Sequence, residues 1–262
     1  MKLHVISRHP PGHESSTPLL FVHGMMHGAW CWDVHFLDFF AEHGFAAHAV
    51  DLRGHGLSEG RERLRWSRIA DFVDDVAETC RTLSNPPILI GHSMGGFVIQ
   101  KYLERHDAPG AVLLSSPSPS GLWRTVARIA LRTPIAFVKV NLTLSLLPAI
   151  ATPRMTRDSF FSVDLPETEL RGYWEQMEDE SYRALLDMVV LNLPRPARVR
   201  TPMLVLGAAR DGMLAPREIA ATARAYHVRC EIVPDVAHDS MLERHWRGVA
   251  ERILTWVNDR AA

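Results

Sequence analysis

Residues 91 to 96 have the sequence Gly91-His92-Ser93-Met94-Gly95-Gly96, which is the strongest indication of the fold in this chain. A short apolar run, 88–90, precedes them, and a segment with helical character, 97–105, follows. The pattern Gly-x-Ser-x-Gly between a strand and a helix is typical of a sharp turn that presents a serine above a sheet, where the glycines let the backbones approach closely. We therefore predict that Ser93 is a nucleophile, and the alternative is a tight structural turn.

Short apolar runs alternate with amphipathic stretches on both sides of this turn. This alternation predicts a mostly parallel, doubly wound α/β sheet with helices on both faces. The first two apolar runs are joined by a segment rich in Pro, Gly and Ser, and we expect them to form a hairpin. The expected strands are 3–6, 19–22, 45–50, 88–90, 111–114, 203–206 and 228–233. The expected helices are 33–43 (ended by Gly44), 67–83 (capped by Ser67), 97–105, 216–226 and 243–258.

Residues 117–200 interrupt the alternation, because they offer helical stretches with scattered prolines and no convincing strand. We predict an α/β core of residues 1–116 and 201–262 with a helical cap, 117–200, inserted into it. The cap carries more apolar residues than a thin lid needs. They either pack the cap against the sheet or line an acyl pocket above Ser93. The residues concerned are Leu122, Trp123, Val126, Ile129, Ala130, Ile135, Phe137, Val138, Leu142, Leu144, Leu146 and Leu147.

A serine hydroxyl is a weak nucleophile until a base removes its proton, so Ser93 requires a histidine and an acid farther along the chain. Asp211 lies in a turn after the strand 203–206, and His238 lies in the loop after the last strand. Both loops follow the carboxyl ends of strands, where sheets of this kind build their sites. Asp235 and Asp239 are closer to His238 in sequence, but neighbours along a tight loop usually point apart. The alternatives are an ordinary turn aspartate and a bystander histidine.

An oxyanion formed at Ser93 would need two hydrogen-bond donors. We expect one to be the backbone N–H of Met94, just after the nucleophile, and the other to be the N–H of Met25 in the turn after strand 19–22. In this turn Gly24 gives the backbone room to bend inward, and His23 is expected to be structural.

Five ordered motifs together resemble the α/β-hydrolase family. The resemblance implies an eight-stranded sheet, a catalytic triad of Ser93, Asp211 and His238, a structural role for 51–58, and no metal or organic cofactor. The motifs are His23-Gly24, Asp51-Leu52-Arg53-Gly54-His55-Gly56-Leu57-Ser58, Gly91-His92-Ser93-Met94-Gly95-Gly96, Gly207 to Asp211, and Ala237-His238.

Two of these segments resemble different branches of the family. Residues 23–32 are similar to the entrance motif of plant methylesterases and hydroxynitrile lyases. Hydroxynitrile lyases have a threonine where this chain has Gly24, which favours esterase chemistry. Residues 51–58 look more like those of bacterial esterases, lactonases and lipases of the monoacylglycerol type. The two resemblances imply different substrates, so the sequence does not identify the substrate.

The composition bounds the partners. Lys plus Arg (29) nearly balance Asp plus Glu (30), so no global field favours nucleic acid or an anionic membrane, and a neutral or apolar small molecule suits the chain better. The three separated cysteines indicate a reducing compartment, and with no secretory signal or membrane span we expect a cytoplasmic protein.

The function expected from these observations is hydrolysis of a carboxylic ester of a small, apolar substrate through an acyl-Ser93 intermediate. A lactonase, another acyl transfer, or a cofactor-free haloperoxidase-like activity would use the same residues. A ligand-binding protein that keeps the fold without turnover is the alternative from another class.

Overall fold

Seven strands form one sheet within the part of the chain that this computed structural model describes, residues 1–12 and 14–260. Their order is β1-β3-β2-β4-β5-β6-β7, and each neighbouring pair is parallel except β1 with β3. The mostly parallel sheet is confirmed, although the resemblance implies eight strands and the described residues form seven. The strands are β1 (Val5–Arg8), β2 (Leu19–Val22), β3 (Ala47–Val50), β4 (Ile88–His92), β5 (Ala111–Leu114), β6 (Met203–Ala208) and β7 (Cys230–Val233).

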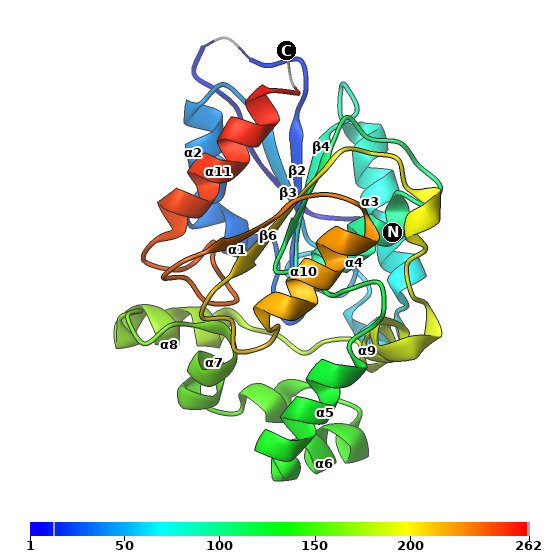
Figure 1. Ribbon diagram of the computed structural model, residues 1–262, viewed down its shortest axis with the longest axis vertical. Helices are drawn as coiled ribbons and strands as arrows, with labels where there is room; N and C mark the ends of the chain where they lie inside the picture. The colour runs from blue at the N-terminus through cyan, green and yellow to red at the C-terminus, as the bar shows by residue number, and fades with distance from the viewer. Residues whose placement is uncertain (13, 261–262) are drawn as a thin grey trace.

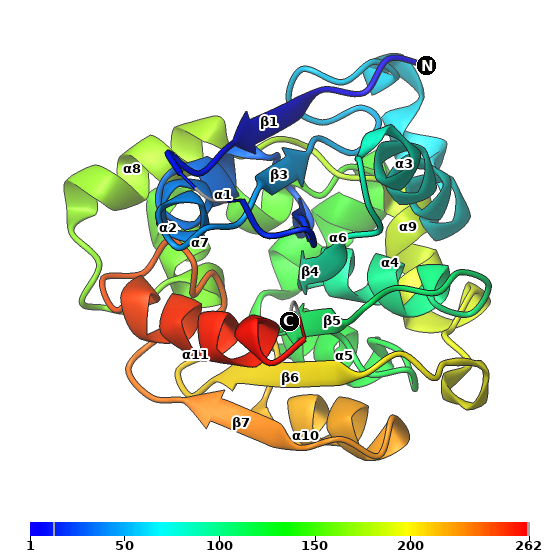
Figure 2. The same ribbon diagram turned by 90° about the horizontal axis from the view of Figure 1, so that it is seen from above.

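Helices cover both faces of the sheet (Figure 1, Figure 2). Leu19 and Phe21 of β2 belong to one buried apolar cluster, whereas Leu20 and Val22 belong to another. Successive strand residues point to opposite faces, so a strand that is apolar throughout has both faces covered. The first cluster includes residues of α1 (Trp30–Asp33), α2 (Phe36–Glu42) and α11 (Trp246–Asn258), and the second includes residues of α3 (Ile69–Thr82), α4 (Met94–Tyr102) and α10 (Pro216–Ala225).

The predicted hairpin of the first two strands is wrong. β1 pairs antiparallel with β3, and β3 lies between β1 and β2. Both edges of the fully buried β2 are occupied by parallel partners, β3 and β4. The half-buried β1 suits the edge of the sheet better, and the proline-containing connection between β1 and β2 is long enough to reach it.

Several predicted helices differ in detail from the structure. α4 begins three residues before the predicted 97–105, and α11 begins three residues after the predicted start of 243–258. The predicted helix 33–43 corresponds to α2 alone, and α1 is a separate turn before it, because His35 leaves the helical region with φ −143° and ψ −44°. Ser67 does not cap α3. It ends a short 3₁₀ helix, Arg61–Trp66, and the Asp71 carboxylate accepts the N–H of Arg68 (2.7 Å) at the start of α3.

The chain between β5 and β6 is helical throughout its described elements, and the helices from α5 to α9 lie below the sheet in Figure 1. Its inner side chains join the clusters of the sheet: Val140, Ile150 and Phe160 join one, and Met188 joins the other. The elements are α5 (Trp123–Arg132), α6 (Pro134–Thr143), a 3₁₀ turn (Leu147–Ile150), α7 (Pro153–Phe160), α8 (Glu167–Gln176), α9 (Tyr182–Leu186), a π turn (Asp187–Leu191) and a 3₁₀ turn (Pro196–Arg198).

Candidate active site

Ser93 occupies the turn between β4 and α4 and is partly exposed. Its backbone has φ 49° and ψ −118°, a conformation that costs energy for a residue with a Cβ. The turn is held by the Ser93 N–H, which donates to the Leu114 carbonyl of β5 (2.9 Å). A Cβ on Gly91 would lie 2.6 Å from the backbone of Gly95, so a larger residue would disrupt the turn. The surrounding structure therefore holds Ser93 in a strained position at the end of the strand.

Asp211 and His238 come from the loops after β6 and β7 and meet in a hydrogen bond of 2.8 Å between Asp211 Oδ2 and His238 Nδ1. The second oxygen of Asp211 accepts the N–H groups of Met213 (2.8 Å) and Leu214 (2.7 Å). Both side chains are buried. Burial alone would lower the pKa of His238, but the Asp211 carboxylate outweighs it, and the pKa is raised above its ordinary value.

Ser93 and His238 lie at the same edge of the sheet, but the described residues contain no hydrogen bond between the Ser93 hydroxyl and the His238 ring. His92, which precedes Ser93, stacks edge-on against His238 with ring centres 4.8 Å apart. Hydrogen bonds of this kind are often long before a substrate is bound. The structure thus joins Asp211 to His238 directly, and it brings His92, the neighbour of Ser93 in the chain, into contact with His238.

The turn after β2 lies against Ser93. A Cβ on Gly24 would be 2.7 Å from His92 Nδ1 and 3.1 Å from Ser93 Cβ, so a side chain at this position would have to displace one of them. The Met25 N–H has no acceptor among the described residues, and Met94, as the first residue of α4, has no acceptor within its helix. His23 donates from Nδ1 to the Gly24 carbonyl (2.8 Å) and accepts the Leu52 N–H (3.1 Å), in keeping with the expected structural role.

A second buried group of polar residues lies beside His238. Asp239 Oδ2 accepts from His27 Nε2 (3.0 Å), and His27 Nδ1 donates to the Met25 carbonyl (2.7 Å). Burial disfavours a charge on His27, but Asp239 outweighs it, so the pKa of His27 is raised. Burial would raise the pKa of Asp239, yet the imidazolium of His27 lowers it. This ion pair connects the turn that contains Met25 with the loop that contains His238.

A third buried pair holds the same turn from the side of the helical insertion. Glu180 Oε2 accepts from His55 Nε2 (3.1 Å) and from the Met26 N–H (3.1 Å), and the Glu178 N–H donates to the Met26 carbonyl (3.0 Å). Met26 has φ 66°, a left-handed conformation that needs such support. The pKa of His55 would fall through burial, but Glu180 raises it.

The sequence did not indicate these last contacts. His27 and His55 were visible within the motifs, but their partners lie 212 and 125 residues away along the chain. From the sequence Asp239 is an alternative to Asp211 as the acid, but in the structure its carboxylate binds His27. Asp235 is exposed and pairs with Arg210 (2.6 Å). No local pattern gives such pairings.

One cluster in the described residues has the side chains of a metal site, His92, His238 and Asp239, whose nitrogen and oxygen atoms lie within 4.8 Å of one another. Asp239 already binds His27, and His92 Nε2 donates to the His238 carbonyl (3.0 Å). Burial and the nearby His238 lower the pKa of His92 to about 3, so its ring is neutral. Each of the three side chains thus has a hydrogen bond to another group, while His92 Nδ1 and Asp239 Oδ1 have no partner among the described residues.

Comparisons with known proteins agree with this architecture. The chain is 23% identical over 231 residues to a monoacylglycerol lipase of Mycolicibacterium smegmatis, covering 83% of this chain and 80% of the relative. It is 26% identical over 216 residues to the phospholipase YtpA of Bacillus subtilis, covering 75% and 76%.

Among solved structures, the fold resembles the monoacylglycerol lipase of Paleococcus ferrophilus, with a TM-score of 0.73, 20% identity, and coverage of 99% of this chain and 100% of that one. A family model described as "Alpha/beta hydrolase family" matches residues 19–252. This match spans all but the ends of the chain, including the turns that hold Ser93, Asp211 and His238, and the protein therefore belongs to the α/β-hydrolase family.

Proposed function

We propose that the protein is a serine hydrolase that cleaves a carboxylic ester of a small, mainly apolar substrate through an acyl-Ser93 intermediate. The observation that supports this best is the 2.8 Å bond from Asp211 to His238, at the sheet edge where Ser93 sits in its strained turn. The lipase and phospholipase relatives support an ester as the substrate.

The three free cysteines support a reducing compartment, which is why we propose the cytoplasm as the location.

In this mechanism Ser93 Oγ attacks the ester carbonyl while His238 Nε2 takes the hydroxyl proton. The developing oxyanion accepts hydrogen bonds from the N–H groups of Met94 and Met25. His238 then gives its proton to the departing alcohol, and the acyl group stays on Ser93. A water molecule attacks the acyl carbonyl, its proton passes to His238, and the acid leaves as Ser93 Oγ regains the proton. Asp211 holds the imidazole in the required tautomer throughout and stabilises its charged form.

The test is the variant Ser93→Ala, assayed with p-nitrophenyl butyrate. Loss of the nucleophile should lower kcat by about a thousandfold to a millionfold while the protein stays folded. A fluorophosphonate probe should add one covalent group to the parent protein and none to Ser93→Ala. Activity within about tenfold of the parent would refute the proposal. A lactone panel and a bromination assay distinguish the alternative activities, and release of acid from any ester excludes a pure ligand-binding role.

A further inference from the structure

The outward side of α5 and α6 carries apolar side chains that no other described residue covers. Leu131 is 86% exposed, Ile135 73%, Val138 53% and Leu142 79%. The last three follow a spacing of three and four residues, which places them in one line along α6, while Val140 on the same helix is buried. We call these four exposed residues, Leu131 at the end of α5 and three residues of α6, the α6 stripe. Because the side chains of Ile135, Val138 and Leu142 are mostly exposed, the packing role expected from the sequence does not account for them.

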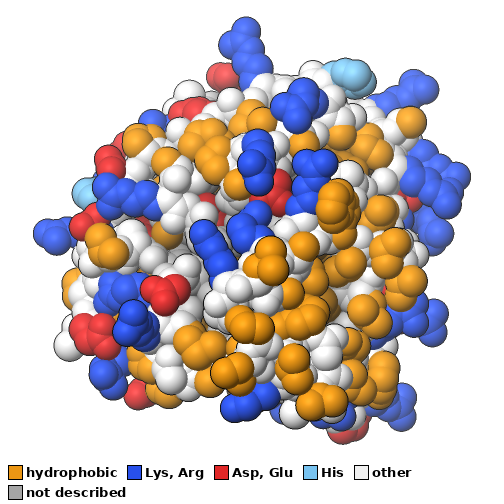
Figure 3. All heavy atoms as spheres, turned by 60° about the horizontal axis from the view of Figure 1, so that its bottom comes forward, with side chains coloured by type: hydrophobic (Ala, Val, Ile, Leu, Met, Phe, Trp, Pro, Cys, Tyr) orange, Lys and Arg blue, Asp and Glu red, His pale blue; other side chains and the backbone are white. Residues whose placement is uncertain are grey.

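The same part of the chain is strongly cationic. Between Asp107 and Asp158 there is no Asp or Glu, but there are six Lys or Arg residues. Because the whole chain has a formal charge of −1, the remainder carries −7. The overall balance therefore conceals a local asymmetry. Figure 3, turned to bring the lower side of the molecule forward, shows hydrophobic side chains gathered together with Lys and Arg side chains around them.

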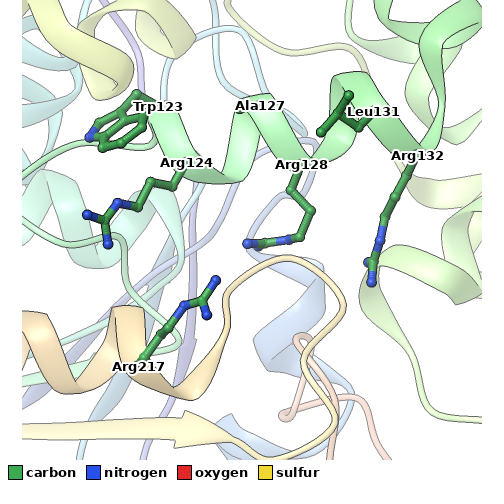
Figure 4. A pocket seen from close by; sticks show the side chains of 7 residues that line it. All are labelled: Trp123, Arg124, Ala127, Arg128, Leu131, Arg132 and Arg217. Atoms are coloured by element: carbon green, nitrogen blue, oxygen red, sulfur yellow. The ribbon is translucent and has the colours of Figure 1, made fainter.

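An arginine-lined groove of about 740 Å³ lies between α5 and the start of α10. In Figure 4 the side chains of Arg124, Arg128 and Arg217 point toward one another across it. Arg128 pairs with Glu218 (3.2 Å), whereas the other arginines of the groove have no carboxylate within 4.0 Å among the described residues. Arg124 and Arg217 are therefore free of carboxylate partners in the described structure, and guanidinium groups of this kind bind phosphate or carboxylate oxygens well. The lining includes Trp123, Leu131, Arg124, Arg128, Arg132 and Arg217.

We propose that this face binds the surface of an anionic lipid bilayer, with the groove arginines on the headgroup phosphates and the α6 stripe among the acyl chains. A free phosphate would account for the arginines but not for the stripe. A second copy of the chain could cover the stripe, but a symmetric contact would bring the same cationic residues face to face. A bilayer surface presents anions directly above hydrocarbon, which matches both parts.

The binding requires no helix across the bilayer, and none of the described helices is long and apolar enough for that. It also does not depend on Ser93, so it can be measured without turnover. Diether phospholipids lack the carboxylic ester that the proposed hydrolase would cleave. Failure of the lipid proposal and failure of the proposed hydrolysis therefore give separate results.

The experiment is flotation with vesicles of diether phosphatidylcholine, alone or mixed in equal parts with diether phosphatidylglycerol. The parent protein should bind the anionic vesicles about tenfold or more tightly than the neutral ones, and added salt should weaken the binding. The stripe variant Ile135→Ser/Leu142→Ser and the groove variant Arg124→Gln/Arg217→Gln should each lose about tenfold or more. All variants should keep the parent rate on p-nitrophenyl acetate, which shows that they are folded.

The matched controls are Leu57→Ser, at a residue that is 78% exposed, and Arg63→Gln, at a side chain that is 88% exposed. Neither residue belongs to the stripe or the groove, and both variants should bind like the parent. The proposal fails if the parent does not float with anionic vesicles, or if the controls lose as much as the test variants. It also fails if the protein binds inorganic phosphate through Arg124 and Arg217 but binds no vesicle. A dimer that dissociates in the stripe variant, without vesicle binding, would identify a contact between copies instead.

Discussion

At the scale of single residues, Asp211 and Asp239 both lie beside His238 but bind different partners. Asp211 holds the His238 ring, whereas Asp239 forms a buried pair with His27. Local sequence was sufficient to predict the contact of Asp211 with His238, because a position just after a strand places Asp211 at the edge of the sheet. It was not sufficient to predict the pair of His27 and Asp239, since nothing in either segment indicates that the two meet.

The first prediction follows from these partners. Asp211→Asn should lower kcat by about ten-thousandfold, because the amide favours the wrong tautomer of His238. Asp235→Asn should stay within about threefold of the parent, as that carboxylate is exposed and pairs only with Arg210 in the described structure. Steady-state rates on p-nitrophenyl butyrate decide between them. If Asp235→Asn abolished turnover and Asp211→Asn spared it, the assignment of the acid would be wrong.

The second prediction concerns pH. His238 must be neutral to accept the Ser93 proton, and its pKa is raised above the ordinary 6.5. The value of kcat/KM for the free enzyme should therefore rise with pH along a limb whose midpoint lies above 6.5. In Asp211→Asn, whose carboxylate no longer stabilises the imidazolium, the residual activity should have its limb at lower pH. A parent profile already flat below pH 6.5 would point to another base.

At the scale of elements, the segment before α9 holds the turn after β2. The Met26 N–H donates to the Glu180 carboxylate, the Met26 carbonyl accepts from the Glu178 N–H, and Met26 adjoins the proposed donor Met25. The helical insertion therefore supports the turn that would bind the oxyanion. The sequence predicted the insertion from its missing strands, but it did not predict this contact, because the pairing of Glu180 with His55 spans 125 residues.

The third prediction tests this support with Glu180→Gln. The glutamine can still accept one hydrogen bond, but it removes the charge that stabilises the His55 imidazolium. Weaker binding of Met26 by residue 180 should displace the neighbouring Met25 N–H. If this N–H binds the oxyanion, the variant should lower kcat by about tenfold or more while KM changes little, because the oxyanion forms only as the reaction approaches its transition state. A boronic acid that forms a tetrahedral adduct should bind the variant more weakly by a similar factor.

The matched control for this change is Glu178→Gln. Glu178 touches Met26 only through its backbone N–H, and its partly exposed side chain binds the Gly56 N–H and Arg61. It should keep both the parent kcat and the parent affinity for the boronic acid. Equal losses in the two variants, or a rise in KM alone for Glu180→Gln, would argue against a role of Glu180 in positioning the turn.

At the scale of the whole molecule, the helical insertion has two sides with different surroundings. Val140, Leu146 and Ile150 are buried and share a cluster with the sheet, while the α6 stripe is exposed. The sequence predicted that this region is rich in apolar residues. It could not assign each of these residues to the buried or the exposed side. Apolar residues occur on both sides of α6, so the helical periodicity is weak, and the direction of each side chain depends on how α6 packs on α5.

The last prediction separates these two sides by function. If buried residues of the insertion line an acyl pocket near Ser93, each substrate CH₂ that enters it contributes about 0.8 kcal/mol, so kcat/KM should rise roughly three- to fourfold per CH₂ until the pocket is full. A series of p-nitrophenyl esters from acetate to decanoate, kept below the concentration at which they form micelles, measures this. The stripe variant Ile135→Ser/Leu142→Ser should give the same series as the parent, because these side chains face solvent. A series that falls from acetate onward would show that the buried residues only pack the insertion. If kcat/KM stopped rising at a shorter acyl chain in the stripe variant than in the parent, exposed residues of α6 would be shown to reach the substrate.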